Sequence, residues 1–353
     1  MSEKSNFEQK GGDNSTNIQG STVTFQYGIN YSEAKDIALE IFRNNFLNLS
    51  HQAAETAKNR AEELVQNFLN KLALRNPESI NNIVDPGIQY SLYTAQKEFA
   101  RTGDKDISDI YIDLLIDRIG LVERDIKQIA YDESLNTITK LTSKQIDTLT
   151  LIFLVKYAPS SGSMDIDFSV KDIFSLFGVN FSYEKSYMDQ LIYTGTAILG
   201  KTAISIESLF LNNYKYCISL GPSAYTKADQ KKINEFMDNK SLAQYLVPSP
   251  INENKKVLPF FNEEDLIRKL TKNNISLEDI NLCKLILRLS EHLAYAKIAA
   301  YLKSQGDIVN KIQECWNNSE LKYFELTTVG QIIAQANYSR KTGKHINLAI
   351  WNN

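Results

Sequence analysis

The chain has 353 residues, of which 43% are hydrophobic and 23% charged, and its formal net charge is -3. This charge excludes a chain-wide electrostatic attraction to nucleic acid or to an anionic membrane. No apolar segment of the secretory type opens the sequence. The longest strongly apolar run, Leu149–Val155, is far shorter than the ~20 residues of a membrane span. The three cysteines are widely spaced, without disulfide-framework or metal-ligand spacing. We therefore expect a soluble cytoplasmic protein with free thiols.

Residues 1–29 are predicted to form a flexible arm that carries one β-strand. Val23, Phe25 and Tyr27 alternate with polar residues, which is the pattern of a half-buried strand. A lone strand has unpaired backbone edges, so it must add to another sheet or pair between subunits. One interpretation is an edge strand or a partly disordered tail. The other is a self-association strand, because polar alternating segments also stack between identical chains.

Residues 30–76 are predicted to be helical, because they contain no Gly or Pro and are followed by Pro77. Asn30 and Glu33 have the spacing of a capping box. The apolar stripe recurs every ~3.8 residues, whereas an ideal helix has about 3.6 residues per turn. Either a single helix meets different neighbours at its two ends, or the helix breaks near Ser50, which could cap a second helix.

Small residues recur along this helix at Ala53, Ala57 and Ala61. Side chains this small allow another helix to approach closely, either within the chain or across a dimer axis. Core packing is the simpler interpretation. The alternative makes these alanines, together with the strand residues, an oligomer interface.

Residues 77–141 continue the helical domain that begins at residue 30. The pattern predicts one helix between Pro86 and Gly103, a second that ends at Gly120, and a short third one towards Ser134.

Residues 142–225 are predicted to form a winged-helix-like module. Thr142 or Ser143 caps a first helix, Val170–Phe177 forms a second, and Ser182–Leu199 forms a third. Two short strands, or a strand and a coil, should follow up to Leu220. The third helix has few cations, unlike helices that read a DNA groove, so a structural or protein-contacting role is favoured over DNA binding.

The rest of the chain is predicted to be a polar linker at 226–262 and a helical region at 263–353. Within this region we expect helices at 263–270, 276–304 and 328–337, a basic turn at 340–344 and a terminal strand at 345–351. The fold class is therefore mainly α, with a long N-terminal helix or helix pair, a helical bundle, the winged-helix-like module and a C-terminal helical region.

Motifs of catalysis are missing, with one partial exception. Gly195, Gly200, Lys201 and Thr202 satisfy the phosphate-loop spacing G-x-x-x-x-G-K-T. A working phosphate loop follows a buried strand and opens a helix, whereas this segment follows a helical pattern and precedes a strand-like one. The histidines lack metal-ligand spacing. No cofactor or metal is expected.

Both ends of the chain carry a family resemblance over nearly its whole length. The N-terminal residues GDNSTNIQGSTVTFQYGINYSEAKDIALEIF and the C-terminal residues LTTVGQIIAQANYSRKTGKHINLAIWNN together resemble an uncharacterised bacterial family. The middle, DPGIQYSLYTAQKEFARTGDKDISDIYIDLLIDR followed by LTSKQIDTLTLIFLV, is distantly similar to the Abi-alpha abortive-infection proteins, which share that helix order. The resemblance implies a place in phage defence and carries over no catalytic residue.

The sequence thus predicts a non-enzymatic, self-associating protein that acts through protein contacts. Its partners would be copies of itself and another defence protein or a phage component. One alternative is a nucleic-acid-binding regulator that uses Arg340, Lys341 and Lys344. Another is an enzyme that binds a nucleoside triphosphate at Gly195–Thr202.

Overall fold

The computed structural model describes residues 29–45, 51–157, 170–178, 184–344 and 348. Within these ranges the chain is mainly helical, with two small two-stranded sheets, as the sequence predicts. None of the described helices is both long and apolar enough to cross a membrane. The strand predicted at Val23, Phe25 and Tyr27 lies outside the described residues, and so does nearly all of the strand predicted at 345–351.

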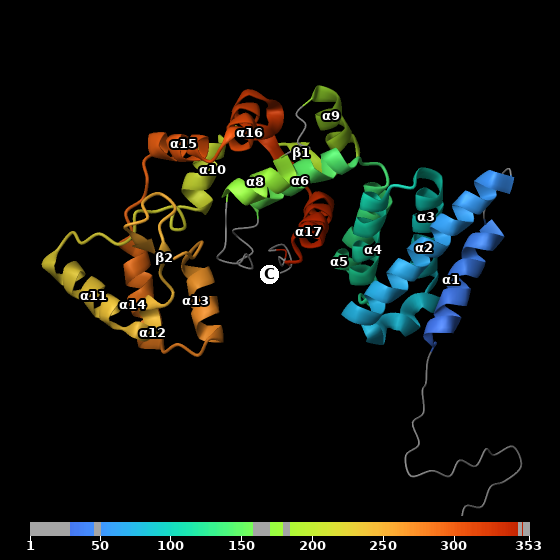
Figure 1. The fold of residues 1–353 in the computed structure, drawn as a ribbon, viewed down its shortest axis with the longest axis horizontal. Helices are drawn as coiled ribbons and strands as arrows, with labels where there is room; N and C mark the ends of the chain where they lie inside the picture. Colours follow the sequence, from blue (N-terminus) through green and yellow to red (C-terminus); the bar gives the residue numbers. More distant parts are fainter. Residues whose placement is uncertain (1–28, 46–50, 158–169, 179–183, 345–347, 349–353) are drawn as a thin grey trace, which may run out of the picture.

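The elements run through three regions of the molecule (Figure 1). The N-terminal region contains α1 (Tyr31–Asn45), α2 (His51–Arg75), the 3-10 helix η1 (Pro77–Val84), α3 (Pro86–Thr102), α4 (Lys105–Ile119) and α5 (Ile126–Ile138). The central region begins with α6 (Ser143–Lys156), α8 (Val170–Gly178), α9 (Lys185–Tyr193), β1 (Ala197–Leu199) and α10 (Ile206–Asn213). It is completed by α15 (Tyr295–Ser304), α16 (Asp307–Asn318), η2 (Glu320–Tyr323), β4 (Phe324–Leu326) and α17 (Thr328–Thr342). The third region, at the opposite end from α1, contains α11 (Lys227–Asp238), α12 (Lys240–Ala243), β2 (Val247–Pro248), β3 (Lys256–Val257), α13 (Glu263–Lys272) and α14 (Leu277–Arg288).

The predicted N-terminal helix is a pair of helices, α1 and α2, which pack against each other. The capping box at the start of α1 is confirmed. Asn30 Oδ1 accepts from the Glu33 backbone N–H, and a Glu33 carboxylate oxygen accepts from the Asn30 N–H, both at 3.0 Å. Of the two alternatives for residues 30–76, a single helix or a broken one, the broken helix is correct, because α1 and α2 are separate helices that pack against each other. Ser50, the proposed second cap, lies outside the described residues.

The C-terminal helix α17 lies at the centre of the molecule. It packs against α4, α5 and α6, and every residue from Gly330 to Tyr338 is buried. Gly330 is required for this packing, because a Cβ atom there would lie 2.0 Å from the backbone oxygen of Thr196. The close neighbour of Gly330 is therefore the turn before β1 rather than another helix.

The helices of the N-terminal and central regions share one large hydrophobic core, and the third region has a smaller core of its own. The smaller core includes Phe236 from α11, Leu266 from α13 and Ile286 from α14. The chain enters and leaves this lobe side by side, since Leu220 N–H donates to Glu291 O at 2.9 Å and Glu291 N–H donates to Gly221 O at 2.8 Å. We call residues 222–289 the small lobe.

The winged-helix detail predicted for 142–225 is not confirmed. The first helix, α6, has the predicted cap at Thr142, and α8 ends at Gly178 as expected. The third helix ends early, at Tyr193, because Gly195 turns the chain at a φ of 69°. Where the first strand after Leu199 is predicted, the chain forms α10, whose buried apolar residues recur with helical spacing. β1 instead pairs antiparallel with β4, far along the sequence.

Two predictions in the second half of the chain are wrong about helix boundaries. Residues 226–262 are not a plain linker, because Thr226 caps α11 with a complete capping box. The polar surface of α11 conceals this helix in the sequence. The helix predicted at 276–304 begins with the expected Ser276 cap but is divided into α14 and α15. Between them the chain turns back to pair at the entrance of the small lobe.

Candidate functional site

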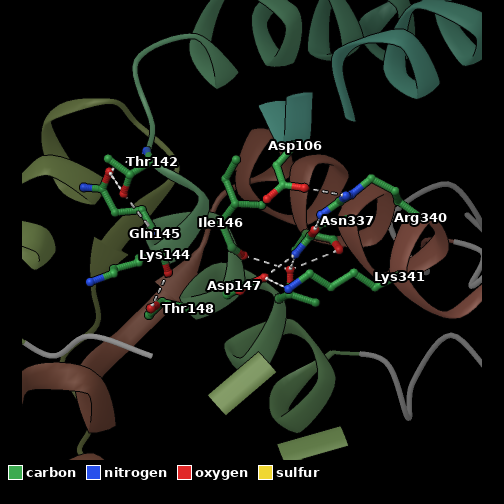
Figure 2. A network of polar contacts seen from close by, with 12 residues as sticks. Asp106, Thr142, Lys144, Gln145, Ile146, Asp147, Thr148, Asn337, Arg340 and Lys341 are labelled. Carbon is green, nitrogen blue, oxygen red and sulfur yellow. Dashed lines mark hydrogen bonds and ion pairs between the residues drawn. The ribbon is translucent and has the colours of Figure 1, made fainter. Parts of the chain in front are cut away.

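The basic residues predicted as a turn lie in the last turns of α17, which continues to Thr342 (Figure 2). Lys341 Nζ lies 2.6 Å from Asp147 Oδ1 on α6. Arg340 donates to Asp106 Oδ1 in the first turn of α4 at 2.9 Å. Two of the three cations proposed for nucleic-acid binding are therefore paired with carboxylates of the chain itself. Lys344 lies exposed just beyond the helix end.

A buried amide completes this junction between α4, α6 and α17. Asn337 Nδ2 donates to Asp147 Oδ1 at 3.0 Å and to Thr150 Oγ1 at 2.8 Å. Figure 2 shows these side chains converging on the Asp147 carboxylate. Lys341 Nζ also lies 5.1 Å from the centroid of the Phe177 ring. A buried carboxylate requires such partners, because leaving it unpaired costs several kcal/mol, on the order of 3–5. The junction joins α4, α6 and α17.

The segment Gly195–Thr202 lacks the surroundings of a phosphate loop. It follows helix α9, and its interior forms β1. A Cβ atom at Gly200 would lie 2.6 Å from a carboxylate oxygen of Glu325, so a negative charge stands beside the loop. The Gly200 N–H donates to Tyr323 O at 2.7 Å and is thus unavailable to a ligand. Lys201 and Thr202 are exposed and do not begin a helix.

The alanine face of α2 is divided between core and surface. Ala57 and Ala61 are buried in a cluster with Phe42 of α1 and Ala100 of α3, whereas Ala53 is exposed. Core packing within the chain therefore accounts for the spacing of Ala57 and Ala61. Ala53 is the member of this set that retains free surface.

The described residues offer little to catalysis by thiols or metals. Burial raises the pKa of both Cys217 and Cys283 to about 12, so neither thiol ionises readily near neutral pH. Within the described ranges, no group of three or more His, Cys, Asp or Glu side chains is placed to hold a metal ion. His51 and His292 lie on the surface, and His345 is outside the described residues.

One buried carboxylate was not predicted to be special by the sequence. Glu207, in the first turn of α10, accepts from Gln313 Nε2 at 2.6 Å, from Asn317 Nδ2 at 2.9 Å and from the Tyr295 hydroxyl at 3.1 Å. Burial alone would raise its pKa, but the hydrogen bonds from Gln313, the backbone, Asn317 and Tyr295 outweigh it and hold the pKa below its usual value. Neutral donors thus keep an ionised Glu inside the protein, where it joins α10 to α15 and α16.

A groove of about 400 Å³ lies in the N-terminal region, between η1, the start of α3, the end of α4 and the loop before α5. We call it the η1 groove. The buried residues Ile88 and Ile119 line it, and its apolar rim is exposed. Val84 is 52% exposed and Val122 is 82% exposed. Exposed apolar side chains beside a groove make it a candidate contact surface for another polypeptide or a ligand.

Hydrogen bonds fix the walls of the η1 groove. Asp85 caps α3 by accepting from the Ile88 N–H at 3.1 Å, and Pro86 follows at the first helical position. The Leu121 carbonyl accepts from Arg118 at 3.3 Å and from Gln128 at 2.9 Å. These bonds hold the loop that carries Val122 against α4 and α5. The groove is therefore formed in advance of any binding.

A second, larger groove of about 670 Å³ lies in the small lobe between α11 and α14. Its lining mixes acidic residues, Glu235, Glu278 and Asp279, with leucines such as Leu277, which is 76% exposed. More charged side chains line this groove than line the η1 groove, so we treat the η1 groove as the candidate site.

A protein-family model, whose description gives only the suffix "-like", matches residues 28–352. The chain belongs to this family. No curated protein and no solved structure matches the chain. The family match covers all the regions described above, including both grooves and the α17 junction. It does not extend to the Abi-alpha proteins, and that resemblance stays a prediction.

The η1 groove is formed by residues that sequence analysis did not single out. Val84, Val122 and Ile88 come from separate segments, and each one resembles an ordinary core residue in the sequence. The available signal was indirect. Asp85-Pro86 marks a turn between two helical patterns, and apolar residues next to such a turn are candidates for exposure.

Proposed function

We propose that the protein acts by binding other proteins and copies of itself, and that it has no catalytic activity of its own. The observation that carries this proposal is the η1 groove, which combines fixed walls with the exposed apolar side chains of Val84 and Val122. Such a surface costs solubility unless it is covered for at least part of the time. Polypeptide is the occupant that fits an apolar groove lined with amide side chains such as Asn81 and Asn82.

The self-association part of the proposal rests on the arm. The alternation of Val23, Phe25 and Tyr27 with polar residues favours a strand that must find a partner. The resemblance to abortive-infection proteins supports a role in phage defence, with another defence protein or a phage component as a further partner. Nucleic-acid binding and nucleotide hydrolysis stay predictions that no observation in the described residues favours.

Light scattering on the purified full-length chain tests this function. We expect a multimer whose mass falls when residues 1–29 are deleted. We also expect a fall when Val23, Phe25 and Tyr27 are all changed to Ser, which leaves the chain length unchanged. The matched control changes Thr22, Thr24 and Gln26 to Ser on the other face of the predicted strand. A monomer in all four proteins would overturn the proposed self-association.

A further inference from the structure

The η1 groove lies where the N-terminal arm joins the helical domain. The backbone N–H of Ile29, the first described residue, donates to Asn81 Oδ1 at 2.8 Å. Asn81 is itself one of the residues that line the groove. The arm thus begins at the edge of an exposed apolar groove.

The arm carries apolar side chains within reach of this groove. An extended residue spans ~3.3 Å, so Tyr27 lies within ~7 Å of Ile29 along the chain and Phe25 within ~13 Å. Both side chains fall on the same face of the predicted strand, together with Val23. The groove volume of about 400 Å³ is large enough for aromatic side chains, since pockets for small ligands start at roughly 300 Å³.

We infer that the η1 groove binds the arm of its own chain, with Phe25 and Tyr27 seated against the apolar lining and Val84 and Val122 covered. The short connection through Ile29 raises the effective concentration of the arm at the groove to the millimolar range, so even weak contacts hold it. No partner free in solution has this advantage at ordinary protein concentrations.

Docking in this way would also prepare the arm for self-association, and to that extent the inference rests on the proposed function. With Phe25 and Tyr27 facing the groove, the opposite face with Thr22, Thr24 and Gln26 points to solvent, and the backbone edges stay unpaired. A second copy can then pair along these edges, as strands do in β-augmentation. The groove would thus hold the arm in place, and the docked arm would offer its unpaired backbone N–H and C=O groups to a second copy of the chain.

Cross-linking of the full-length chain tests the docking directly. Tyr27→Cys is combined with Val122→Cys, and the protein is treated with a short bismaleimide. The matched control combines Tyr27→Cys with Leu74→Cys, because Leu74 is 85% exposed near the end of α2, the helix that packs on η1, but does not line the groove. Native Cys217 and Cys283 react slowly, since burial raises the pKa of each to about 12. Peptide mass spectrometry locates the linked positions, and denaturing gels separate links within one chain from links between chains.

We expect a link within one chain between positions 27 and 122 that is at least tenfold more abundant than the link to position 74. Adding Phe25→Ser should reduce it severalfold. Equal linking to both positions would mean that the arm samples the surface without docking, and would overturn the inference. Links between chains at position 122 would assign the groove to a second copy instead, and no link at position 122 would leave the arm elsewhere.

The two proposals can fail separately. If the protein is a monomer and gives the expected link within one chain, the docking of the arm is supported and self-association is excluded. If the protein is a multimer without that link, self-association is supported and the docking of the arm in the groove is excluded.

Discussion

The two hydrophobic cores of the molecule each contain a buried aspartate, but the two are neutralised in different ways. In the large core, Asp147 on α6 is paired with Lys341 at 2.6 Å and with Asn337 at 3.0 Å, both on α17. In the small lobe, the Asp265 side chain is fully buried and pairs with Arg268 at 2.7 Å and Lys269 at 3.0 Å, three and four residues further along the same helix. The first network joins residues 194 positions apart in the sequence, whereas both ion pairs of the second are formed within α13.

This difference predicts how far damage spreads in each region. Removing the carboxylate of a long-range network should loosen the packing between helices. Removing the carboxylate of a local network should loosen a single helix. The small lobe is connected to the remainder where the chain enters and leaves it, with the Ser223 N–H donating to Leu289 O at 2.9 Å beside the Leu220–Glu291 contacts. Phe261 of the lobe also packs in the large core, against Tyr214. Such a lobe can open locally without unfolding the large core.

The largest expected effect comes from Asp147→Ala. This change leaves the Lys341 ammonium without its carboxylate in a mostly buried position, and breaking a buried pair typically costs about 3–5 kcal/mol. Because Lys341 retains some solvent access, we expect the free energy of unfolding to fall by about 3 kcal/mol, the lower end of this range. Urea denaturation measures this change. Hydrogen exchange should rise in α4, α6 and α17 together.

Two variants sharpen this result. Replacing both partners, Asp147→Leu with Lys341→Met, should recover most of the lost stability, since an apolar pair needs no neutralisation. Asp265→Ala should raise exchange in α13 and neighbouring parts of the small lobe while leaving α17 protected. If Asp147→Ala and Asp265→Ala gave the same pattern of exchange, the contrast between the two cores would be lost.

The next effect compares two glycines. In Gly330→Ala the added methyl group would lie 2.0 Å from Thr196 O, and in Gly221→Ala it would lie 2.2 Å from Lys256 O at a φ of 83°. Overpacking costs about 1–3 kcal/mol, and the left-handed backbone at Gly221 adds about 1–2 kcal/mol. We expect Gly330→Ala to lower the global melting temperature, and Gly221→Ala to loosen mainly the small lobe. Gly306→Ala separates backbone strain from crowding, because Gly306 has a φ of 114° and no atom lies within 4 Å of a Cβ atom there.

The local parts of this architecture follow from the sequence, and the long-range parts do not. The caps at Asn30, Thr142 and Ser276 are predictable, because each depends on residues within one helical turn. The end of α9 is missed, because the apolar residues up to Leu199 continue its helical pattern, and α10 is missed, because the run from Ile206 fits a strand pattern as well as a helical one. Local patterns cannot decide between the two when a distant strand, β4, supplies the pairing.

The central position of α17 is hidden for a related reason. A helix that is buried on all sides is normally apolar all round, but this one buries Gln331, Gln335 and Asn337. One of the partners of Asn337 is Asp147, which lies 190 positions earlier in the sequence. The η1 groove has the same origin, since its lining comes from η1, α3, α4 and α5. Each segment is predictable, but the surface they form together is not.

The smallest expected effect is a pH dependence that separates a buried carboxylate from an exposed one. Hydrogen bonds hold the pKa of Glu207 below its usual value against the effect of burial, and in the small lobe Arg288 lowers the pKa of Glu263. A carboxyl whose pKa is depressed in the folded state adds stability above its unfolded pKa, near pH 4.5, and loses it as the pH falls through the folded value. The stability difference between wild type and Glu207→Gln should therefore be larger at pH 7 than at pH 3. The same should hold for Glu263→Gln, but 1 M salt should reduce this effect, because the Glu263–Arg288 ion pair is accessible to solvent and exposed ion pairs are weakened by salt. Urea denaturation at both pH values and both salt concentrations measures the four differences.

A Glu207 effect that salt abolished would mean that its hydrogen-bonded site is open to water. The large core would then neutralise this carboxylate no better than the surface of the small lobe does.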